Sequence, residues 1–131
     1  MADTRRPLSP HLQVYRWQVQ MVSSLLHRAT GVALAVGSVL VVTGLLALAG
    51  GEQCFDAFRR VAGSPLGMLL LFGWSWALFY HLCNGIRHLI QDTGAGYSIA
   101  QFVRSSWLSM GISVVLTLLT WAYILMTGGA A

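Results

Sequence analysis

The chain alternates between long apolar stretches and short polar segments. Three apolar runs contain no Asp, Glu or Arg, and they cover residues 29–51, 61–86 and 105–131. An α-helix rises about 1.5 Å per residue, so each run is long enough to cross the roughly 30 Å hydrocarbon core of a bilayer. The pattern predicts an all-α membrane protein with three transmembrane helices.

The polar residues between these runs set the expected boundaries. We expect helices over about residues 23–50, 65–91 and 104–127, with a short amphipathic N-terminal segment over 1–22, in a single membrane-anchor domain covering 1–131. The charged residues between the first two helices are expected in a connecting loop. The N-terminal segment carries Arg5, Arg6, Pro7 and Arg16 where a cleaved signal peptide would need an uninterrupted apolar region. The first helix is therefore expected to remain in the mature chain.

Composition agrees with this class, because 56% of the residues are hydrophobic and only 9% are charged. All basic residues are arginines, and six of them lie on one predicted side of the membrane: Arg5, Arg6, Arg16, Arg28, Arg87 and Arg104. The other side has only Arg59 and Arg60, next to Glu52 and Asp56. The positive-inside rule places the N-terminus inside and the C-terminus outside. We expect a bacterial inner membrane, with the mitochondrial inner membrane as the alternative. Topology explains the net charge of +4, so no nucleic-acid partner is indicated.

Polar side chains gather at one predicted depth of the membrane. His81 and His88 lie seven residues apart, almost two helical turns, so they share a face of the second helix with Asn84. On the first helix, Ser24, His27, Arg28 and Gly31 follow the i, i+3, i+4, i+7 spacing of one face. The two helices run in opposite directions, which brings both faces to the inner side. Ionisable residues inside a membrane are costly and typically mark a functional site.

Two ligands suit such a pocket. Neutral imidazole binds haem iron, and His27 and Arg28 could contact the haem propionates. A quinone instead needs donors aimed at its carbonyl oxygens, and Ser24 and Arg28 could supply them. The residues alone leave both interpretations open.

Structural roles are also open for each residue taken singly. A histidine near a helix end can bond a backbone carbonyl, and Ser24 can bond its own helical turn. Arg28 and Arg87 stand at span ends, where arginine commonly signals topology. Cys54 and Cys83 lie in different regions, so the sequence indicates neither a disulfide nor a metal clip. The third helix is interpreted as packing, with Ser109, Gly111 and Ser113 allowing close helix contacts.

Three segments in the same order resemble the cytochrome b anchor family of succinate dehydrogenase, respiratory complex II. They are Arg6-Pro7-Leu8-Ser9-Pro10-His11-Leu12-Gln13-Val14-Tyr15, then Ser24-Leu25-Leu26-His27-Arg28-Ala29-Thr30-Gly31, then residues 81–92. The resemblance implies a subunit of succinate:quinone oxidoreductase that works with a second small membrane anchor, an iron-sulfur subunit and a flavoprotein subunit. It also implies one b-type haem shared with the second anchor, and ubiquinone or menaquinone as substrate.

The resemblance assigns roles to individual positions. His81 would be the haem axial ligand, and Ser24 and Arg28 would belong to the quinone site. His27 would lie near the haem propionates, and His88 would contact a propionate or support the helix. The chain has no flavin fingerprint and no cysteine cluster, so it is not expected to oxidise a dicarboxylate by itself.

Three alternatives remain at this stage. The chain could be a self-contained bis-histidine cytochrome, in which His27, or His88 of a neighbouring copy, supplies the second ligand. It could be a scaffold with structural histidines. It could also serve a fumarate reductase, which runs the reaction in the opposite direction.

Overall fold

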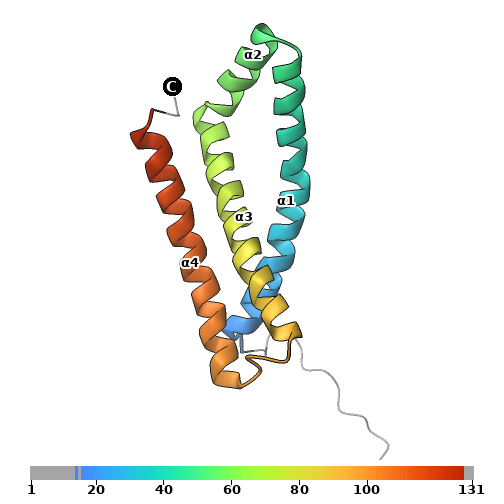
Figure 1. The fold of residues 1–131 in the computed structure, drawn as a ribbon, viewed down its shortest axis with the longest axis vertical. Helices are drawn as coiled ribbons and strands as arrows, with labels where there is room; N and C mark the ends of the chain where they lie inside the picture. Colours follow the sequence, from blue (N-terminus) through green and yellow to red (C-terminus); the bar gives the residue numbers. More distant parts are fainter. Residues whose placement is uncertain (1–13, 15, 129–131) are drawn as a thin grey trace, which may run out of the picture.

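The computed structural model describes residues 14 and 16–128, and this part of the chain is α-helical without a strand (Figure 1). Four helices follow one another as α1 (Val19–Ala49), α2 (Glu52–Ala62), α3 (Pro65–Asp92) and α4 (Ile99–Met126). The expected all-α class is confirmed. Most of the predicted amphipathic segment, with the motif that begins at Arg6, lies outside the described residues.

Three of these helices are long and apolar enough to cross a membrane. They are α1 with 31 residues and α3 and α4 with 28 residues each. A helix of 28 residues is about 42 Å long, which exceeds the roughly 30 Å hydrocarbon core. Each helix therefore reaches past the hydrocarbon on one or both sides, and the three predicted spans are confirmed.

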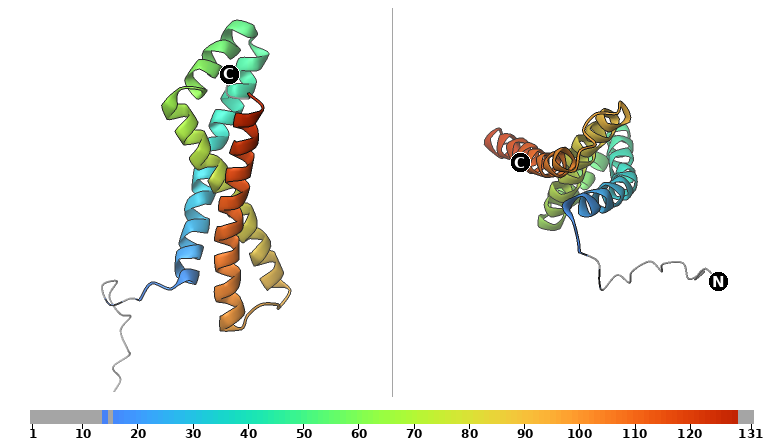
Figure 2. Two further views of the ribbon diagram at one scale, coloured as in Figure 1. Left: turned by 90° about the vertical axis from the view of Figure 1, so that its left-hand side faces the viewer. Right: turned by 90° about the horizontal axis from the view of Figure 1, so that it is seen from below.

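The long helices form an elongated bundle in which α3 lies between α1 and α4 (Figure 1). In that view α1 and α3 lie apart where α2 connects them and come together at the opposite end. We call this opposite end, where α1 begins, α3 ends and α4 begins, the histidine end. The other is the α2 end, and Figure 2 shows that α4 finishes on that side.

Capping residues explain where two of the helices begin. The Ser64 hydroxyl oxygen accepts a hydrogen bond from the Gly67 amide at 3.1 Å, and Pro65 occupies the first turn. These are standard start signals, and α3 begins where it was expected. The Ser98 hydroxyl similarly accepts from the Gln101 amide at 3.4 Å, so α4 begins at Ile99, ahead of the expected residue 104.

Both α1 and α4 begin earlier than expected, since α1 begins at Val19 and not at 23. The two early starts have the same physical reason. The expected boundaries were drawn where polar residues end an apolar run. Polarity marks the limit of the hydrocarbon, whereas the backbone hydrogen bonds of a helix continue beyond it.

The helix α2 replaces the loop expected between the first two spans. The turn into it uses Gly51 at φ 98°, a backbone conformation that favours glycine. Glu52 lies in the first turn and Arg59 and Arg60 in the last, so the charges complement the helix dipole. The expected loop is wrong at this point, because the charged residues of this segment are ordered to suit the dipole of a helix.

The interior of the bundle is mostly polar and its surface apolar. Only Ala77 and Tyr80 are buried hydrophobic residues among those described, whereas the buried polar residues are Ser23, Thr30, Asn84, Arg87, Gln91, Ser106, Ser109, Ser113 and Thr117. Helices in lipid associate through small residues, close packing and interhelical hydrogen bonds, because lipid already solvates the apolar side chains. The arrangement is the one expected for an integral membrane protein.

The small residues of α4 meet the packing role expected of them, with one exception. Ser109 and Ser113 are buried, and each donates a hydrogen bond to a carbonyl of its own helix, at 3.0 and 2.7 Å. They can therefore pack closely without leaving a free donor. Gly111 is exposed, and a Cβ there would meet nothing within 4 Å, so it makes no close helix contact in this chain.

Candidate functional site

Three histidines from two helices meet at the histidine end. The rings of His27 from α1 and His81 from α3 stack with their centroids 4.0 Å apart and their planes at 12°. His27 also contacts His88, with centroids 5.2 Å apart and planes at 48°. The residues expected at one depth are thus in direct contact, because α1 and α3 run in opposite directions.

The His81 ring is held by the backbone of α1. Its Nδ1 lies 3.1 Å from the His27 carbonyl oxygen and 3.3 Å from the Thr30 hydroxyl oxygen. A carbonyl can only accept, so Nδ1 must carry the proton that makes this bond. The neutral ring then keeps its lone pair on Nε2.

Thr30 is placed to accept from the same Nδ1–H. Its hydroxyl proton is shared between the carbonyls of Leu26 and His27, at 2.8 and 3.0 Å. The lone pairs of the hydroxyl oxygen therefore remain available to accept a hydrogen bond from His81. Thr30 is itself buried. Two acceptors on α1 therefore fix one tautomer and one orientation of His81.

A glycine permits this close approach of α1 to His81. A Cβ at Gly31 would lie 3.1 Å from His81 Cε1, which is tighter than ordinary van der Waals contact. Gly31 was expected on the same face as His27, and its place against His81 agrees with that expectation. A larger side chain would displace the ring from its acceptors.

Ser24 and Arg28 lie at the edge of the histidine cluster. Arg28 is exposed, Ser24 is half-buried, and the Arg28 Nε donates to the Ser24 backbone carbonyl at 3.4 Å. The pair is therefore adjacent, as its spacing of one helical turn predicts. The structure places the Arg28 side chain against the Ser24 backbone at the surface of this chain, and not in the bundle interior.

A buried network that the sequence reading did not identify connects α1 to α3. The Ser23 hydroxyl donates to Asn84 Oδ1 at 3.0 Å, and the Tyr80 hydroxyl donates to the Ser23 carbonyl at 2.9 Å. All three residues are fully buried. The expected polar face on α1 included Ser24, but its neighbour Ser23 makes the contact with α3. Two adjacent serines look alike in sequence, and only the rotation of the helix distinguishes them.

Arg87 extends this network toward α4. Its Nε donates to Asn84 Oδ1 at 2.9 Å, and its guanidinium carbon lies 4.8 Å from the centre of the Phe102 ring. The residue is only 6% exposed. The reading of Arg87 as a topology signal at a span end therefore misses its place inside the bundle.

Several polar atoms of this region have no partner within the described part of the chain. They include His27 Nδ1, Asn84 Nδ2 and Arg87 Nη1. Such buried groups are costly unless something else satisfies them. Within residues 14 and 16–128, no three His, Cys, Asp or Glu side chains converge around a possible metal ion.

Comparison with known proteins places this sequence in a family. Residues 2–120 match the family described as succinate dehydrogenase/fumarate reductase transmembrane subunit. The succinate dehydrogenase cytochrome b556 subunit of Paracoccus denitrificans is 45% identical, over 92% of this chain and 95% of the relative. The corresponding subunit of Rickettsia felis is 40% identical over 89% and 91%.

A mitochondrial relative is also similar. The succinate dehydrogenase cytochrome b560 subunit of Sus scrofa is 39% identical over 86% of this chain and 68% of the relative. The resemblance seen in the motifs of α1 and α3 is therefore confirmed over nearly the whole sequence. An integral membrane protein with three apolar helices and histidines meeting at one end, this chain belongs to the family of succinate dehydrogenase/fumarate reductase transmembrane subunits.

Proposed function

We propose that this chain is the cytochrome b anchor of a succinate:quinone oxidoreductase. Together with a second small anchor subunit it holds one b-type haem and forms the site where quinone is reduced. Electrons reach that site from an iron-sulfur subunit, which receives them from a flavoprotein that oxidises succinate. The names of the relatives, succinate dehydrogenase cytochrome b556 and b560 subunits, support this role.

The observation that carries the haem assignment is the hydrogen bond of His81. With Nδ1 bound to the His27 carbonyl at 3.1 Å, the ring presents Nε2 as a ligand atom of fixed orientation. Histidines that bind a metal typically donate their other ring N–H to a carbonyl or carboxylate in this way. We therefore assign His81 as the axial ligand from this chain.

The surroundings of His81 fit a haem in a second respect. His27 Nδ1 is buried and has no partner among the described residues, yet its ring touches that of His81. A haem carries propionates that need hydrogen-bond donors or cations. His27 is suited to contact one of them, and His88, which touches His27, supports the cluster from the next turns of α3.

The geometry argues for a second axial ligand from another subunit. The stacked rings of His27 and His81, 4.0 Å apart, leave no space for a macrocycle between them. His88 lies about 10 Å along the helix from His81, too far to bind the same iron from the other side. These distances favour the shared haem over the self-contained bis-histidine cytochrome. A bound b-type haem supplies one-electron transfer.

Ser24 and Arg28 are assigned to the quinone. Their place at the exposed edge of the histidine end suits a site completed by partner subunits. The Ser24 hydroxyl would orient one quinone carbonyl, and the planar guanidinium of Arg28 would stabilise the negative charge that develops on that oxygen during reduction. The proposed contacts suit ubiquinone and menaquinone alike, since both present two quinone carbonyls.

The distribution of the arginines supports one membrane orientation. Arg16, Arg28, Arg87 and Arg104 belong to the histidine end, whereas α2 balances Arg59 and Arg60 with acidic residues. We place the histidine end at the cytoplasmic face of a bacterial inner membrane, with the C-terminus outside. The soluble subunits would then dock beside Ser24 and Arg28.

A difference absorbance spectrum tests this function. The complex is purified through a partner subunit, and its dithionite-reduced minus oxidised spectrum is recorded for wild type, His81→Ala and His88→Ala. We expect His81→Ala to lose the b-type haem bands at equal recovery of the partner subunits. His88→Ala is the matched control, because His88 lies on the same helix face about two turns away, and this variant should keep the bands.

The outcomes separate the alternatives. Unchanged bands in His81→Ala would show that His81 is not the axial ligand. Loss of the bands only in His88→Ala would assign that role to His88. A wild-type complex without haem bands would favour the scaffold. Succinate-dependent quinone reduction measured against the reverse reaction distinguishes the succinate dehydrogenase from the fumarate reductase.

A further inference from the structure

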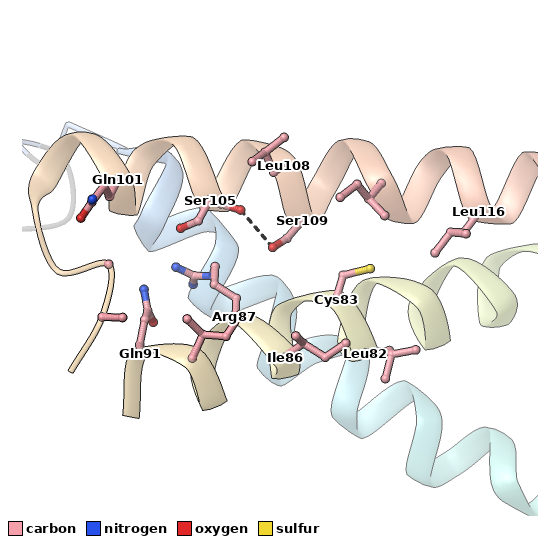
Figure 3. Close-up of a pocket in the computed structure, with 14 residues that line it drawn as sticks. Leu82, Cys83, Ile86, Arg87, Gln91, Gln101, Ser105, Leu108, Ser109 and Leu116 are labelled. Carbon is pink, nitrogen blue, oxygen red and sulfur yellow. Dashed lines mark hydrogen bonds between the residues drawn. The ribbon is translucent and has the colours of Figure 1, made fainter. Parts of the chain in front are cut away.

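A cavity of about 640 Å³ lies between α3 and α4 (Figure 3), and no histidine is among the residues that line it. The side chains of Arg87 and Gln91 project from α3 toward α4, and Gln101 and Ser105 stand on the facing helix. Toward the middle of the membrane the lining becomes apolar, with Leu82, Ile86, Leu108, Ile112 and Leu116. The cavity is thus polar at the histidine end and apolar along its length.

The cavity opens on the side of α3 that faces away from the histidines. At about 100° per residue, Cys83, Ile86 and Ile90 lie about 200°, 140° and 180° around the helix from His81. All three line the cavity. The haem and quinone assignments use the His81 face, so they leave this opposite face to lipid or to another molecule.

The polar end contains a buried cation without a counter-ion. Arg87 is 6% exposed and its Nη1 has no hydrogen-bond partner, although its Nε bonds Asn84. Gln91, also 6% exposed, has an unpartnered Nε2. No acidic side chain among residues 14 and 16–128 forms an ion pair with Arg87. A buried charge of this kind is costly unless an anion pairs with it.

The depth of Arg87 matches a lipid head group. It lies five residues before Asp92, the last residue of α3, which is about 7.5 Å of helix. The 28-residue helix exceeds the hydrocarbon thickness by about 12 Å, so about 6 Å extends past each boundary when it is centred. Arg87 therefore lies close to the boundary between hydrocarbon and head groups, where a phosphate would be found.

We propose that this cavity binds one anionic phospholipid. Its phosphate pairs with the guanidinium group of Arg87 at the polar end of the cavity, and an acyl chain lies along the apolar lining between α3 and α4. Basic pockets between transmembrane helices recognise anionic head groups in this manner. The proposal rests on the α3–α4 cavity and is independent of the haem and quinone assignments.

The two cysteines of the chain provide the test. Cys83 lines the cavity, and Cys54 is exposed on α2 at the far end. The purified, delipidated complex is treated with N-ethylmaleimide in four samples, with phosphatidylglycerol, phosphatidylcholine, a short-chain quinone or nothing added. Labelling of each cysteine is followed by peptide mass spectrometry. We expect phosphatidylglycerol to slow labelling of Cys83 about tenfold more than phosphatidylcholine does, and to leave Cys54 unchanged.

Variants identify the residue responsible. Arg87→Gln should abolish the difference between the two lipids, whereas Arg104→Gln, an exposed arginine of α4 at the same end, should keep it. If Arg87→Gln does not assemble, Gln101→Glu adds a negative charge at an exposed position of the cavity lining and should selectively weaken protection by phosphatidylglycerol.

Three results would overturn the proposal. Equal protection by both lipids, unchanged in Arg87→Gln, would reduce the cavity to an apolar groove without head-group recognition. Protection by a short-chain quinone but by neither lipid would assign it to quinone. Labelling of Cys83 at the same rate with and without either lipid would show that neither lipid occupies the cavity.

Discussion

The two ends of the bundle are held together by different interactions. At the histidine end, α1 and α3 are joined by hydrogen bonds among Ser23, Tyr80 and Asn84, and by the bond from His81 to the backbone of α1. Toward the α2 end, packing of glycine against aromatic rings replaces them. Gly37 lies against the Trp74 indole, and Gly44 against the Phe58 ring of α2.

This difference shows how one short chain combines a site with an anchor. Hydrogen bonds have preferred directions, so they fix the rotation of a helix and the orientation of a ring. Packing against lipid and small residues sets only the distance between helices. Directional contacts are concentrated where His81 must be oriented, and the α2 end needs only to hold the helices across the membrane.

The largest expected effect tests whether chemistry is confined to the histidine end. Arg28→Ala should lower quinone reductase turnover about a hundredfold, because it would remove the donor that we propose stabilises the charge developing on the quinone oxygen. Arg28→Lys should restore only part of it, because an ammonium cannot reproduce the planar fork. Steady-state succinate:quinone reductase assays at equal haem content measure this.

Arg60→Ala is the matched control, since Arg60 is an exposed arginine of α2 at the other end. It should stay close to wild type. Full turnover in Arg28→Ala would contradict the assignment of Arg28 to the quinone site. An equal loss of turnover in Arg60→Ala would show that the assay measures assembly of the complex and not quinone chemistry.

A smaller effect compares hydrogen bonds at the two ends. Asn84→Ala removes the acceptor of Ser23 and of the buried Arg87, and should destabilise the complex by about 2 kcal/mol. Ser75→Ala removes a single interhelical bond, from Trp121 Nε1 at 2.9 Å, and should cost about 0.6 kcal/mol. Thermal dissociation of the purified complex gives both values. Equal losses would contradict the view that the histidine end depends more strongly on hydrogen bonds.

The smallest effect concerns packing toward the α2 end. A methyl group at Gly37 would overlap the Trp74 indole, so Gly37→Ala should cost about 1 kcal/mol. At Gly111 the added methyl meets nothing within 4 Å, and Gly111→Ala should be neutral or slightly stabilising through helix propensity. The same thermal assay checks the pair, and a stable Gly37→Ala complex would show that the indole moves without cost. Neither variant should alter the haem spectrum.

Much of the fold could be predicted because a membrane imposes simple rules. Charge-free runs identified α1, α3 and α4, and the Ser64–Pro65 pair located the start of α3. The helix α2 was missed, since its charges resemble those of a loop until their order is compared with the helix dipole. The opposite directions of the first two membrane helices also predicted that His27, His81 and His88 lie at one level, and the contacts between their rings agree with this prediction.

The sequence by itself determined the class, the three spans and the depth at which the polar residues gather, because these follow from hydrophobic length and helical spacing. Only the tertiary structure decided which atoms meet. It selected Ser23 over Ser24 for the contact with α3, bound His81 Nδ1 to the His27 carbonyl, and buried Arg87 beside α4. The reason is that helical spacing fixes which residues share a face, whereas the rotation and approach of packed helices depend on every contact between them.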